Sequence, residues 1–324
     1  MALVLDSDNH LGFIDERGRK LDFGDLYLRE GFSDSLTIAS QLDNGRASGK
    51  FLLVNHSGKV VANVDQYYVN RFSEGLAAFM ERKGWGATPS KSNAPFGHRR
   101  GYLDQVGRIV IPARFAYAAP FSEGLAAVAS DGQCWVADWG GWHYPAPSAA
   151  VQFTSCGPEA AASVVQPCRH GYIDRTGRLH IPERYELAQD FSQERAAVRL
   201  GGKWGFIDRS GTDVTAFRFD EVKPFSENRA AVRVGTKWGY IDRSGSNVID
   251  TQFDDALTFT SGLAAAKKGP YYSFINALGA EVIHGPYIHA TQFVKGLAHV
   301  QIGETKWAWI DRTGKAVFTY DWKQ

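Results

Sequence analysis

The clearest pattern in this sequence is an alternation of apolar and polar positions that begins at residue 230. Ala230, Val232 and Val234 alternate with Ala231 and Arg233, which is the period of two expected for a strand with one buried face. This stretch is therefore predicted to be a β-strand that lies against a packed core.

Two turn signals divide the residues that follow this strand. The pair Gly235-Thr236 is a Gly-x connection of the kind that closes tight hairpins. A second strand is predicted over residues 237–242. Asp242 and Gly245 are the first and fourth residues of the segment that follows, as in a type I turn, and a short third strand is predicted at 248–249. The segment therefore predicts a three-stranded antiparallel meander.

The second strand of this meander places large rings on one face. Trp238 and Tyr240 share that face, whereas Gly239 on the other face leaves room for another backbone or ring to come close. A two- or three-stranded unit is marginal in water, so the rings are expected to pack between neighbouring units. Burial of one tryptophan, roughly 200 Å² at about 25 cal/mol per Å², is worth on the order of 5 kcal/mol before entropy.

The same segment recurs along the whole chain. Positions equivalent to Trp238 occur nine times, at Leu11, Phe51, Arg100, Cys134, His170, Trp204, Trp238, Tyr272 and Trp307. Each of these marker positions is followed by Asp or Asn four residues later and by Gly seven residues later, and most are followed by Phe after twenty-one. A period of this length is typical of solenoids, propellers and repeat arrays.

These residues resemble the WG-repeat family of bacterial proteins, named for the Trp-Gly pair present here as Trp204-Gly205 and Trp238-Gly239. The motif W-G-aromatic-Ile-Asp-x-x-Gly and a later Phe-Ser-Glu-Gly-Leu-Ala-like segment carry the resemblance over nearly the whole chain. Other residues replace the tryptophan in the first four copies. The resemblance implies a β-rich bacterial array that acts as a binding scaffold, with no catalytic residues common to the family.

The predicted fold is all-β, with nine three-stranded antiparallel meanders of about 34 residues stacked as an open, curved β-solenoid or superhelix. Each meander is complete in sequence, so no unit needs a strand from the opposite terminus. The alternative is a closed or open propeller-like ring, favoured if the connection around Phe253 holds a fourth strand. The whole chain, 1–324, is predicted to be a single array, with divergent copies over 1–133, a degenerate fourth copy over 134–169 and regular copies over 170–324.

Two irregular stretches interrupt the array. The first is an insertion over residues 82–98, and the second is a run rich in Trp, Gly and Pro at 135–147. Insertions in repeat proteins often form the binding face, although a solvated loop is the simpler interpretation of the first and a core patch fits the second equally well. The candidate partner-binding residues are Trp85, Arg99, Arg100, Trp139, Trp142, His143 and Tyr144.

Composition and charge narrow the classes of partner. The chain is 44% hydrophobic and has a formal net charge of +1, so no nucleic acid is expected as a partner. No apolar run approaches the roughly 20 residues that cross a bilayer, so no membrane partner is expected. The first residues lack the features of a secretory signal, which favours a cytoplasmic location, although leaderless export would leave no trace. The expected state is a monomer.

Motifs for catalysis and for cofactor binding are absent from the sequence, so neither an enzyme nor a cofactor is predicted. Cys134, Cys156 and Cys168 have the spacing of neither a disulfide framework nor a zinc site and are predicted to be small buried fillers. His170 stands at a marker position, so we expect it to be a core or interface ring.

The turn after the marker strand raises two further questions. The repeated Asp is predicted to accept hydrogen bonds from the backbone of its own turn. The arginine beside it recurs as Arg175, Arg209, Arg243 and Arg312. These arginines are interpreted as solvated turn residues, with a ladder for an acidic partner as the alternative.

The predicted function is a non-catalytic scaffold that binds another protein, as an adaptor or as the neutralising partner of a toxin or secreted effector. A glycan- or cell-wall-binding module is the alternative, because exposed Trp and Tyr on β-repeats can stack on sugar rings. A glycan binder should expose aromatic residues at equivalent repeat positions, whereas a protein binder should concentrate them in the irregular stretches.

Overall fold

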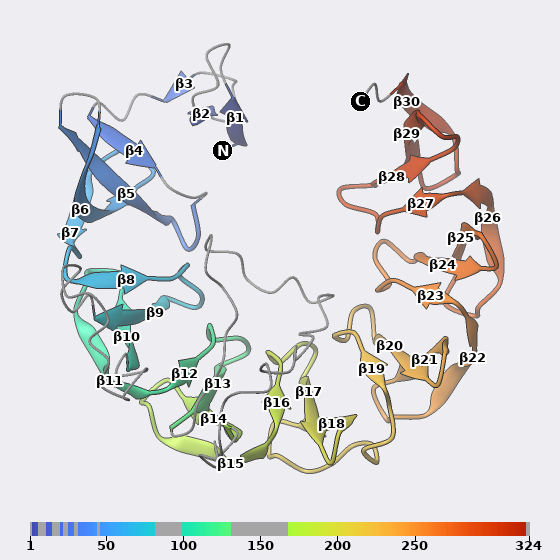
Figure 1. Cartoon of the computed structure of the whole chain (residues 1–324), viewed down its shortest axis with the longest axis horizontal. Coiled ribbons are helices and arrows are strands. Elements are labelled where there is room, and N and C mark those ends of the chain that lie inside the picture. Colours follow the sequence, from blue (N-terminus) through green and yellow to red (C-terminus); the bar gives the residue numbers. More distant parts are fainter. Residues whose placement is uncertain are drawn as a thin grey trace, which may run out of the picture. The chain divides into compact units, whose positions relative to one another are not determined.

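The computed structural model describes residues 2–5, 11–14, 20–21, 25–28, 32–43, 46–81, 99–130 and 168–321 (Figure 1). Within these residues the chain forms antiparallel strands joined by turns and irregular connections, and it contains no helix. The all-β prediction is therefore confirmed. In the same part of the chain, no helix is available that could cross a membrane.

The described strands form eight sheets and belong to two compact units. The first unit holds the described residues up to 130 together with 168–183, and the second holds 184–321. Strand β15 (Leu179–Tyr185) carries the chain from the first unit into the second.

Each sheet is a simple meander, because neighbouring strands in the sheet also follow one another in the sequence. Four sheets begin in the first unit. The first sheet contains β1 (Ala2–Leu5), β2 (Leu11–Ile14) and β3 (Lys20–Leu21), and the second contains β4 (Leu26–Leu28), β5 (Leu36–Asp43), β6 (Arg46–Asn55) and β7 (Val60–Asn63). The third contains β8 (Tyr67–Val69), β9 (Leu76–Glu81), β10 (Arg100–Asp104) and β11 (Ile109–Phe115), and the fourth contains β12 (Tyr117–Ala118), β13 (Leu125–Ala129), β14 (His170–Asp174) and β15.

The second unit continues the series with four more sheets. The fifth sheet contains β16 (Leu187–Ala188), β17 (Arg195–Leu200) and β18 (Lys203–Asp208), and the sixth contains β19 (Glu221–Val222), β20 (Arg229–Val234), β21 (Lys237–Asp242) and β22 (Asn247–Phe253). The seventh contains β23 (Asp255–Ala256), β24 (Ala264–Lys268), β25 (Tyr271–Ile275) and β26 (Glu281–Tyr287), and the eighth contains β27 (His289–Ala290), β28 (Leu297–Gln301), β29 (Lys306–Asp311) and β30 (Ala316–Asp321). No sheet closes on itself within the described residues.

The structure corrects the predicted three-stranded meander. Six of the eight sheets have four strands. In the sheet β23–β26, for example, the connection that follows Phe253 contains a further two-residue strand, β23, which pairs with β24. The side chain of Ala256 in β23 is fully buried, so packing holds this short segment at the sheet edge. Two residues are too few to produce a periodic signal in the sequence.

The predicted count of nine copies is not confirmed. The eight sheets contain eight of the nine marker positions, and the copy predicted at Cys134 lies outside the described residues. Strand β13 pairs directly with β14, with Val128 opposite Gly171. The chain between β13 and β14 therefore does not interrupt the pairing of this hairpin.

Successive sheets of the second unit bury one face against the next sheet. We call the face of β21 that carries Trp238 and Tyr240 the forward face, and the opposite face the backward face. Trp238 is 4% exposed and Tyr240 is 1% exposed, and the Tyr240 ring lies 4.9 Å from the ring of Phe259. The predicted packing of these rings between neighbouring repeats is therefore confirmed.

The backbone geometry of the repeat agrees with the predictions made for Asp242 and Gly239. Asp242 Oδ1 accepts hydrogen bonds from Ser244 N at 2.8 Å, from Ser244 Oγ at 2.6 Å and from Ser246 N at 3.1 Å. A Cβ atom on Gly239 would lie 2.6 Å from the carbonyl oxygen of Ile249, so the neighbouring strand does approach the backbone closely.

Two of the recurring turn arginines join neighbouring sheets. Arg243 forms an ion pair with Glu194, and Arg175 Nη2 donates a hydrogen bond of 2.6 Å to the carbonyl oxygen of Glu74. Arg175 is exposed and Arg243 is partly exposed, as expected of solvated turn residues, but each also contacts a neighbouring sheet. The turns of successive repeats hold each other through these contacts.

Candidate protein-binding site

Two insertions, over residues 82–98 and 131–167, occupy the same place in the repeat, which is the hairpin before the strand that carries the marker position. In an uninterrupted hairpin, Val234 pairs with Lys237 and only Gly235-Thr236 lies between them. The first insertion separates β9 from β10, yet Met80 still pairs with Arg100. The second insertion separates β13 from β14, which also keep their register. Each insertion therefore leaves and re-enters its sheet at adjacent points.

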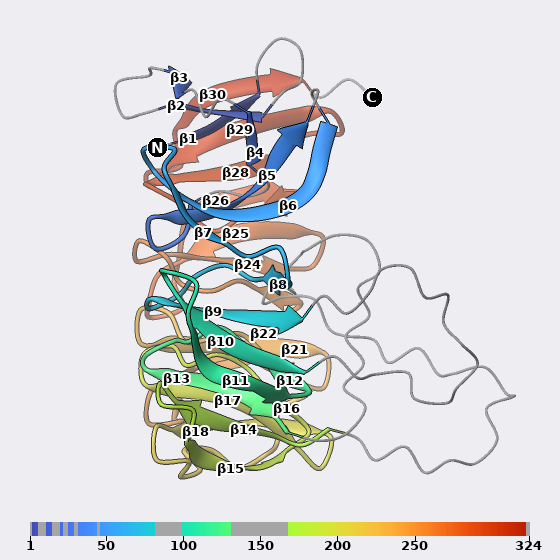
Figure 2. The same ribbon diagram turned by 90° about the vertical axis from the view of Figure 1, so that its left-hand side faces the viewer.

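The sheets β8–β11 and β12–β15, which the two insertions leave, follow one another in the first unit (Figure 2). Arg99, the first described residue after residues 82–98, donates hydrogen bonds from Nη1 to the carbonyl oxygens of Arg114, at 3.2 Å, and of Ser130. Ser130 is the last described residue before the second insertion. We call Arg99, Arg100, Ser130 and Glu183 the insertion base.

A carboxylate fixes the start of the second insertion. The two oxygens of Glu183, on β15, accept hydrogen bonds from Ser130 N at 3.0 and 3.1 Å, and Ser130 Oγ donates to Glu183 Oε1 at 2.5 Å. Hydrogen bonds to an ionised partner are stronger than those between neutral groups. Arg99 at the carbonyl group and Glu183 at the amide group therefore hold Ser130 from both sides of its backbone.

Arg100 supplies a second positive charge at the insertion base. Its side chain is partly buried, and its Nη1 donates a hydrogen bond to the carbonyl oxygen of Ala116. Burial lowers the pKa of the Arg100 guanidinium, while the nearby Tyr117 and Tyr102 act to raise it. A guanidinium nevertheless keeps its charge in proteins, so Arg100 remains a cation.

The second insertion returns to its sheet through buried residues. His170 is buried, and its ring meets Tyr117 edge to face at 5.2 Å, so the prediction of a core ring is confirmed. Cys168 is also buried, but it is disulfide-bonded, so its prediction as a simple filler is wrong. Cys134 and Cys156, which the same prediction covered, lie outside the described residues.

The structure brings two of the predicted partner-binding residues together. Arg99 and Arg100 both lie in the insertion base. Outside the described residues are Trp85, Trp139, Trp142, His143 and Tyr144. Sequence analysis missed Ser130 and Glu183, because only the strand pairing of β13, β14 and β15 brings these distant residues into contact.

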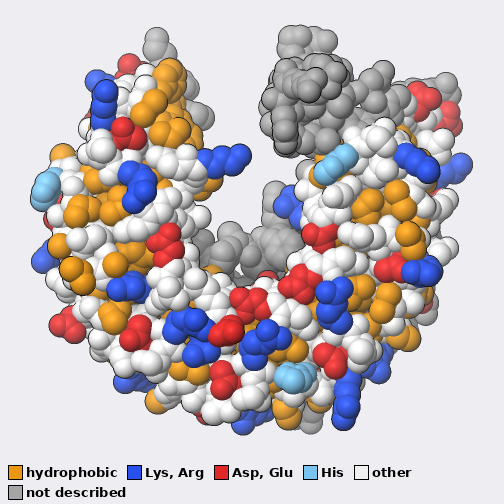
Figure 3. All heavy atoms as spheres, turned by 180° about the vertical axis from the view of Figure 1, so that it is seen from behind, with side chains coloured by type: hydrophobic (Ala, Val, Ile, Leu, Met, Phe, Trp, Pro, Cys, Tyr) orange, Lys and Arg blue, Asp and Glu red, His pale blue; other side chains and the backbone are white. Residues whose placement is uncertain are grey.

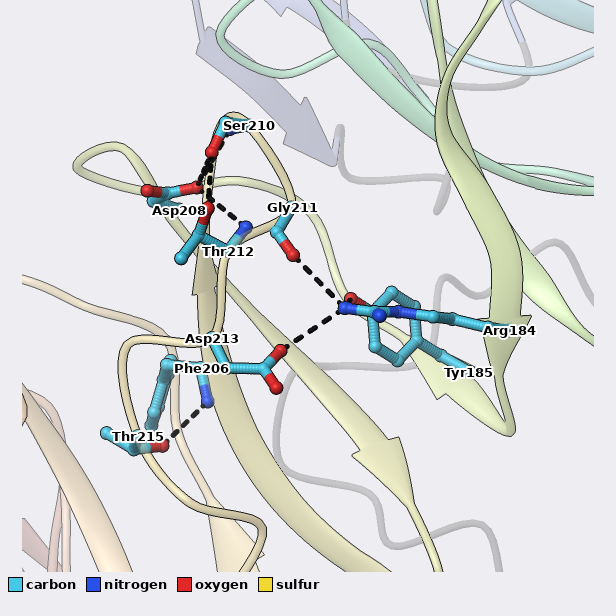
Figure 4. A network of polar contacts seen from close by, with 9 residues as sticks. All are labelled: Arg184, Tyr185, Phe206, Asp208, Ser210, Gly211, Thr212, Asp213 and Thr215. Carbon is cyan, nitrogen blue, oxygen red and sulfur yellow. Dashed lines mark hydrogen bonds and ion pairs between the residues drawn. The ribbon is translucent and has the colours of Figure 1, made fainter.

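A second polar network lies in the second unit around Arg184 (Figure 4). Arg184 Nη2 donates hydrogen bonds to Tyr185 OH at 2.7 Å, to the Gly211 carbonyl oxygen at 3.1 Å and to Asp213 Oδ1 at 3.3 Å. In the same turn, the Ser210 hydroxyl lowers the pKa of Asp208 through its hydrogen bond. These groups bind one another and hold the turn against β15, so the network is structural.

The insertion base can anchor loops but does not form a catalytic centre. Its polar groups are engaged with backbone atoms or with one another. Nowhere in the described part of the chain do three His, Cys, Asp or Glu side chains group as a metal site requires. The arrangement therefore offers a hydrogen-bonded support at the described ends of the two insertions.

Comparison with known proteins identifies the repeat. The family model of the WG containing repeat matches residues 101–134, 171–204, 204–238 and 238–269. The predicted resemblance to WG-repeat proteins is therefore confirmed across this region. The match passes over residues 135–170, most of which lie between strands β13 and β14. No curated protein matches the chain.

Solved structures with a similar arrangement are distant in sequence. The computationally designed Ika8 protein is 12% identical, with a TM-score of 0.45 over 91% of this chain and 86% of that chain. BamB from Moraxella catarrhalis is 10% identical, with a TM-score of 0.46 over 99% and 89%. A eukaryotic initiation factor is 10% identical, with a TM-score of 0.45 over 99% and 95%. At these values the likenesses bear on neither function nor partner.

Proposed function

Residues 101–134 and 171–269 of this chain match the WG containing repeat, and from this premise we propose that the chain is a non-catalytic scaffold that binds another protein. It binds through the two insertions, over residues 82–98 and 131–167, that leave successive sheets of the first unit. The partner is a toxin or secreted effector that the chain neutralises, or a protein that the chain holds as an adaptor.

The observation that carries this proposal is the hydrogen bond from Arg99 to the carbonyl oxygen of Ser130. It places the end of the first insertion beside the start of the second. The hairpins closed by residues 201–202, 235–236 and 269–270 need only two residues. The insertions are thus unnecessary for the repeat itself, and paired excursions on one side of a repeat array are typical of a binding face.

The distribution of aromatic side chains favours a protein over a glycan. Among the rings at repeated positions, Trp238, Tyr240 and Phe274 are buried, whereas Trp309 in the last sheet is 38% exposed, so these positions do not present a row of open ring faces to a glycan. The two insertions, by contrast, contain four of the nine tryptophans of the chain. Tryptophan is enriched among the residues that dominate protein–protein binding energy.

The charge distribution supports recognition by shape and aromatic contacts. On the face drawn in Figure 3, Lys and Arg side chains lie among Asp and Glu side chains and form no large patch of one sign. The formal net charge is +1. A partner selected mainly by long-range attraction would need a surface dominated by one charge.

The proposal is tested by replacing each insertion with the two-residue turn of an uninterrupted hairpin. One variant joins Glu81 to Arg99 through Gly-Thr in place of residues 82–98. The other joins Ser130 to Arg169 through Gly-Thr in place of residues 131–168. Both strand pairs can keep their register, with Met80 opposite Arg100 and Val128 opposite Gly171. The matched control changes the turn at 235–236 from Gly-Thr to Gly-Gly.

Wild type and variants are first compared by circular dichroism and then used to capture proteins from an extract of the native source. We expect one protein to be retained by wild type and by the control. Its Kd should rise at least tenfold, about 1.4 kcal/mol, in each shortened variant. Retention of the same protein by both shortened variants, or the absence of a specific protein on wild type, would contradict the proposal and make a glycan array the next measurement.

A further inference from the structure

The forward face of the sheet β27–β30 carries a continuous group of aromatic rings. The strand register sets His299 opposite Trp309, and Trp309 opposite Phe318, with Trp307 opposite Tyr320 in the next row. The His299 ring lies 4.6 Å from Trp307 and 4.7 Å from Trp309, and its Nε2 is 2.8 Å from the Tyr320 hydroxyl. We call these five residues the aromatic face.

The equivalent face of the preceding sheet, β23–β26, is covered. Phe274 occupies the position of Trp309 and is 0% exposed, and Ile283 occupies the position of Phe318 and is 5% exposed. Both pack against the backward face of β27–β30. Trp309 and Phe318, in contrast, are 38% and 60% exposed. The aromatic face therefore has the position of a contact between repeats but remains open.

The residues of this face are larger and more aromatic than their counterparts in the preceding sheet. His299 stands where that sheet has Ala265, and Phe318 stands where it has Ile283. A repeat face that meets only water is expected to be polar. Large exposed rings grouped in one place instead mark a surface on which another protein packs.

The surface that covers a forward face elsewhere in the second unit has a simple pattern. On the backward face of β28 and β29, Ala298 is opposite Ile310 and Val300 is opposite Ala308. All four side chains are buried against the sheet before them. Small and branched aliphatic residues thus form the complement of a forward face.

The first sheet of the chain has the same residue pattern. Its backbone register sets Ala2 opposite Ile14 and Val4 opposite Gly12. Counted from the marker position Leu11, Ala2, Val4, Gly12 and Ile14 correspond to Ala298, Val300, Ala308 and Ile310 counted from the marker position Trp307. In backbone register and residue type, β1 and β2 therefore match β28 and β29, whose backward face covers the forward face of the preceding sheet.

We propose that the aromatic face of one chain docks on the backward face of β1–β3 of a second copy of this chain. Chains then associate head to tail, and each contact continues the repeat series from one copy into the next. Such an interface joins two different surfaces, so it builds rings or open filaments rather than two-fold dimers. The proposal replaces the expected monomer with a concentration-dependent assembly and stands independently of the partner-binding insertions.

The size of the face sets the strength of this association. Four strands spaced about 4.8 Å apart, with roughly five residues of ~3.4 Å each, give a footprint on the order of 300 Å² per copy. Contacts this small lie below the standard size of stable complexes. We therefore expect a Kd on the order of 10 to 100 µM, which decides the concentrations that must be sampled.

The first test is sedimentation velocity from about 1 to 500 µM, a range that brackets the expected Kd. The wild-type sedimentation coefficient should rise with concentration, whereas that of the Trp309→Ser/Phe318→Ser variant should stay constant. The control is Leu278→Ser, which removes a side chain that is 85% exposed in a turn outside the aromatic face and should behave as wild type. A wild type that stays monomeric, or a double variant that still associates, overturns the proposal.

The second test identifies the occupant of the face. A photo-crosslinking amino acid at position 318 is irradiated in an equal mixture of ¹⁵N-labelled and unlabelled chains. Crosslinks between a labelled and an unlabelled chain, ending in residues 2–14, support docking of a second copy. Crosslinks confined to one isotope, crosslinks to another segment, or a glycan that binds the face of a monomeric chain each overturn it.

Discussion

The hydroxyl group of Tyr240 donates a hydrogen bond of 2.7 Å to the carbonyl oxygen of Leu257, which leads into the next sheet of the second unit. Tyr102 makes the same bond in the first unit, at 2.6 Å to the carbonyl oxygen of Ala119. Other copies have phenylalanine at this position, as at Phe206. The contact between sheets therefore accepts a ring with or without the hydroxyl group, and the hydrogen bond can be tested alone.

We predict that Tyr240→Phe lowers the free energy of unfolding by about 1 kcal/mol, because the ring still fits while the partly buried carbonyl group of Leu257 loses its donor. Urea unfolding followed by fluorescence measures the change. Tyr271→Phe, at an exposed tyrosine of the same unit, is the control and should change little. A loss above 3 kcal/mol for Tyr240→Phe would mean that the hydroxyl group supports more than this single bond.

Removal of the Trp238 ring should cost considerably more. Trp238 is buried between neighbouring sheets, and Lys223 Nζ lies over its ring at 5.0 Å from the centroid. Trp238→Ala is expected to lower the free energy of unfolding by roughly 3 to 5 kcal/mol, as for other large-to-small core changes. The same urea experiment provides the measurement. A loss below about 1 kcal/mol is incompatible with a ring that packs between sheets.

The aspartates of the repeated turn predict a loss of stability in acid. Hydrogen bonds from the hydroxyl groups of neighbouring Ser or Thr, the largest of several causes, lower the pKa of Asp208, Asp242 and Asp311 below the ordinary value of 3.8. Because the folded pKa lies below the unfolded value, these carboxylates contribute stability above that value. The contribution is lost as the pH falls through the folded pKa values.

The chain itself suggests the variant that tests this pH dependence. Asn276 fills the same turn position, and its Oδ1 accepts hydrogen bonds from Leu278 N at 2.9 Å and Ala280 N at 3.1 Å. Replacing Asp208, Asp242 and Asp311 by Asn should therefore keep the turns but flatten the stability profile below about pH 4. Urea unfolding at a series of pH values provides the comparison, and an unchanged slope in the triple variant contradicts the assignment.

The sequence predicts the parts of this fold that depend on local chemistry. The turn of Asp242, the close backbone approach at Gly239 and the burial of Trp238 all follow from residue type and spacing. Strand β23 escapes prediction, because two residues carry no periodicity and only packing of Ala256 holds them in place.

The insertion base is less predictable for a different reason. The flanking arginines are visible in sequence as the end of an insertion, but their neighbours are set by long-range strand pairing. The Asp and Gly spacing around Cys134 matches the other copies, yet β13 pairs with β14 beyond it. Spacing alone does not report which strands pair, so neither Ser130 nor Glu183 is identified before the fold is known.

The disulfide at Cys168 gives a prediction that also bears on location. The chain has three cysteines, so one intramolecular disulfide leaves a single thiol. We expect denatured protein, purified without reductant, to react with one equivalent of a thiol reagent, and fully reduced protein to react with three. Disulfides persist in oxidising compartments and are rare in a reducing cytosol. Rapid alkylation of protein taken directly from its native source therefore tests the expected cytoplasmic location: three labelled thiols support it, and one places the chain in an oxidising compartment.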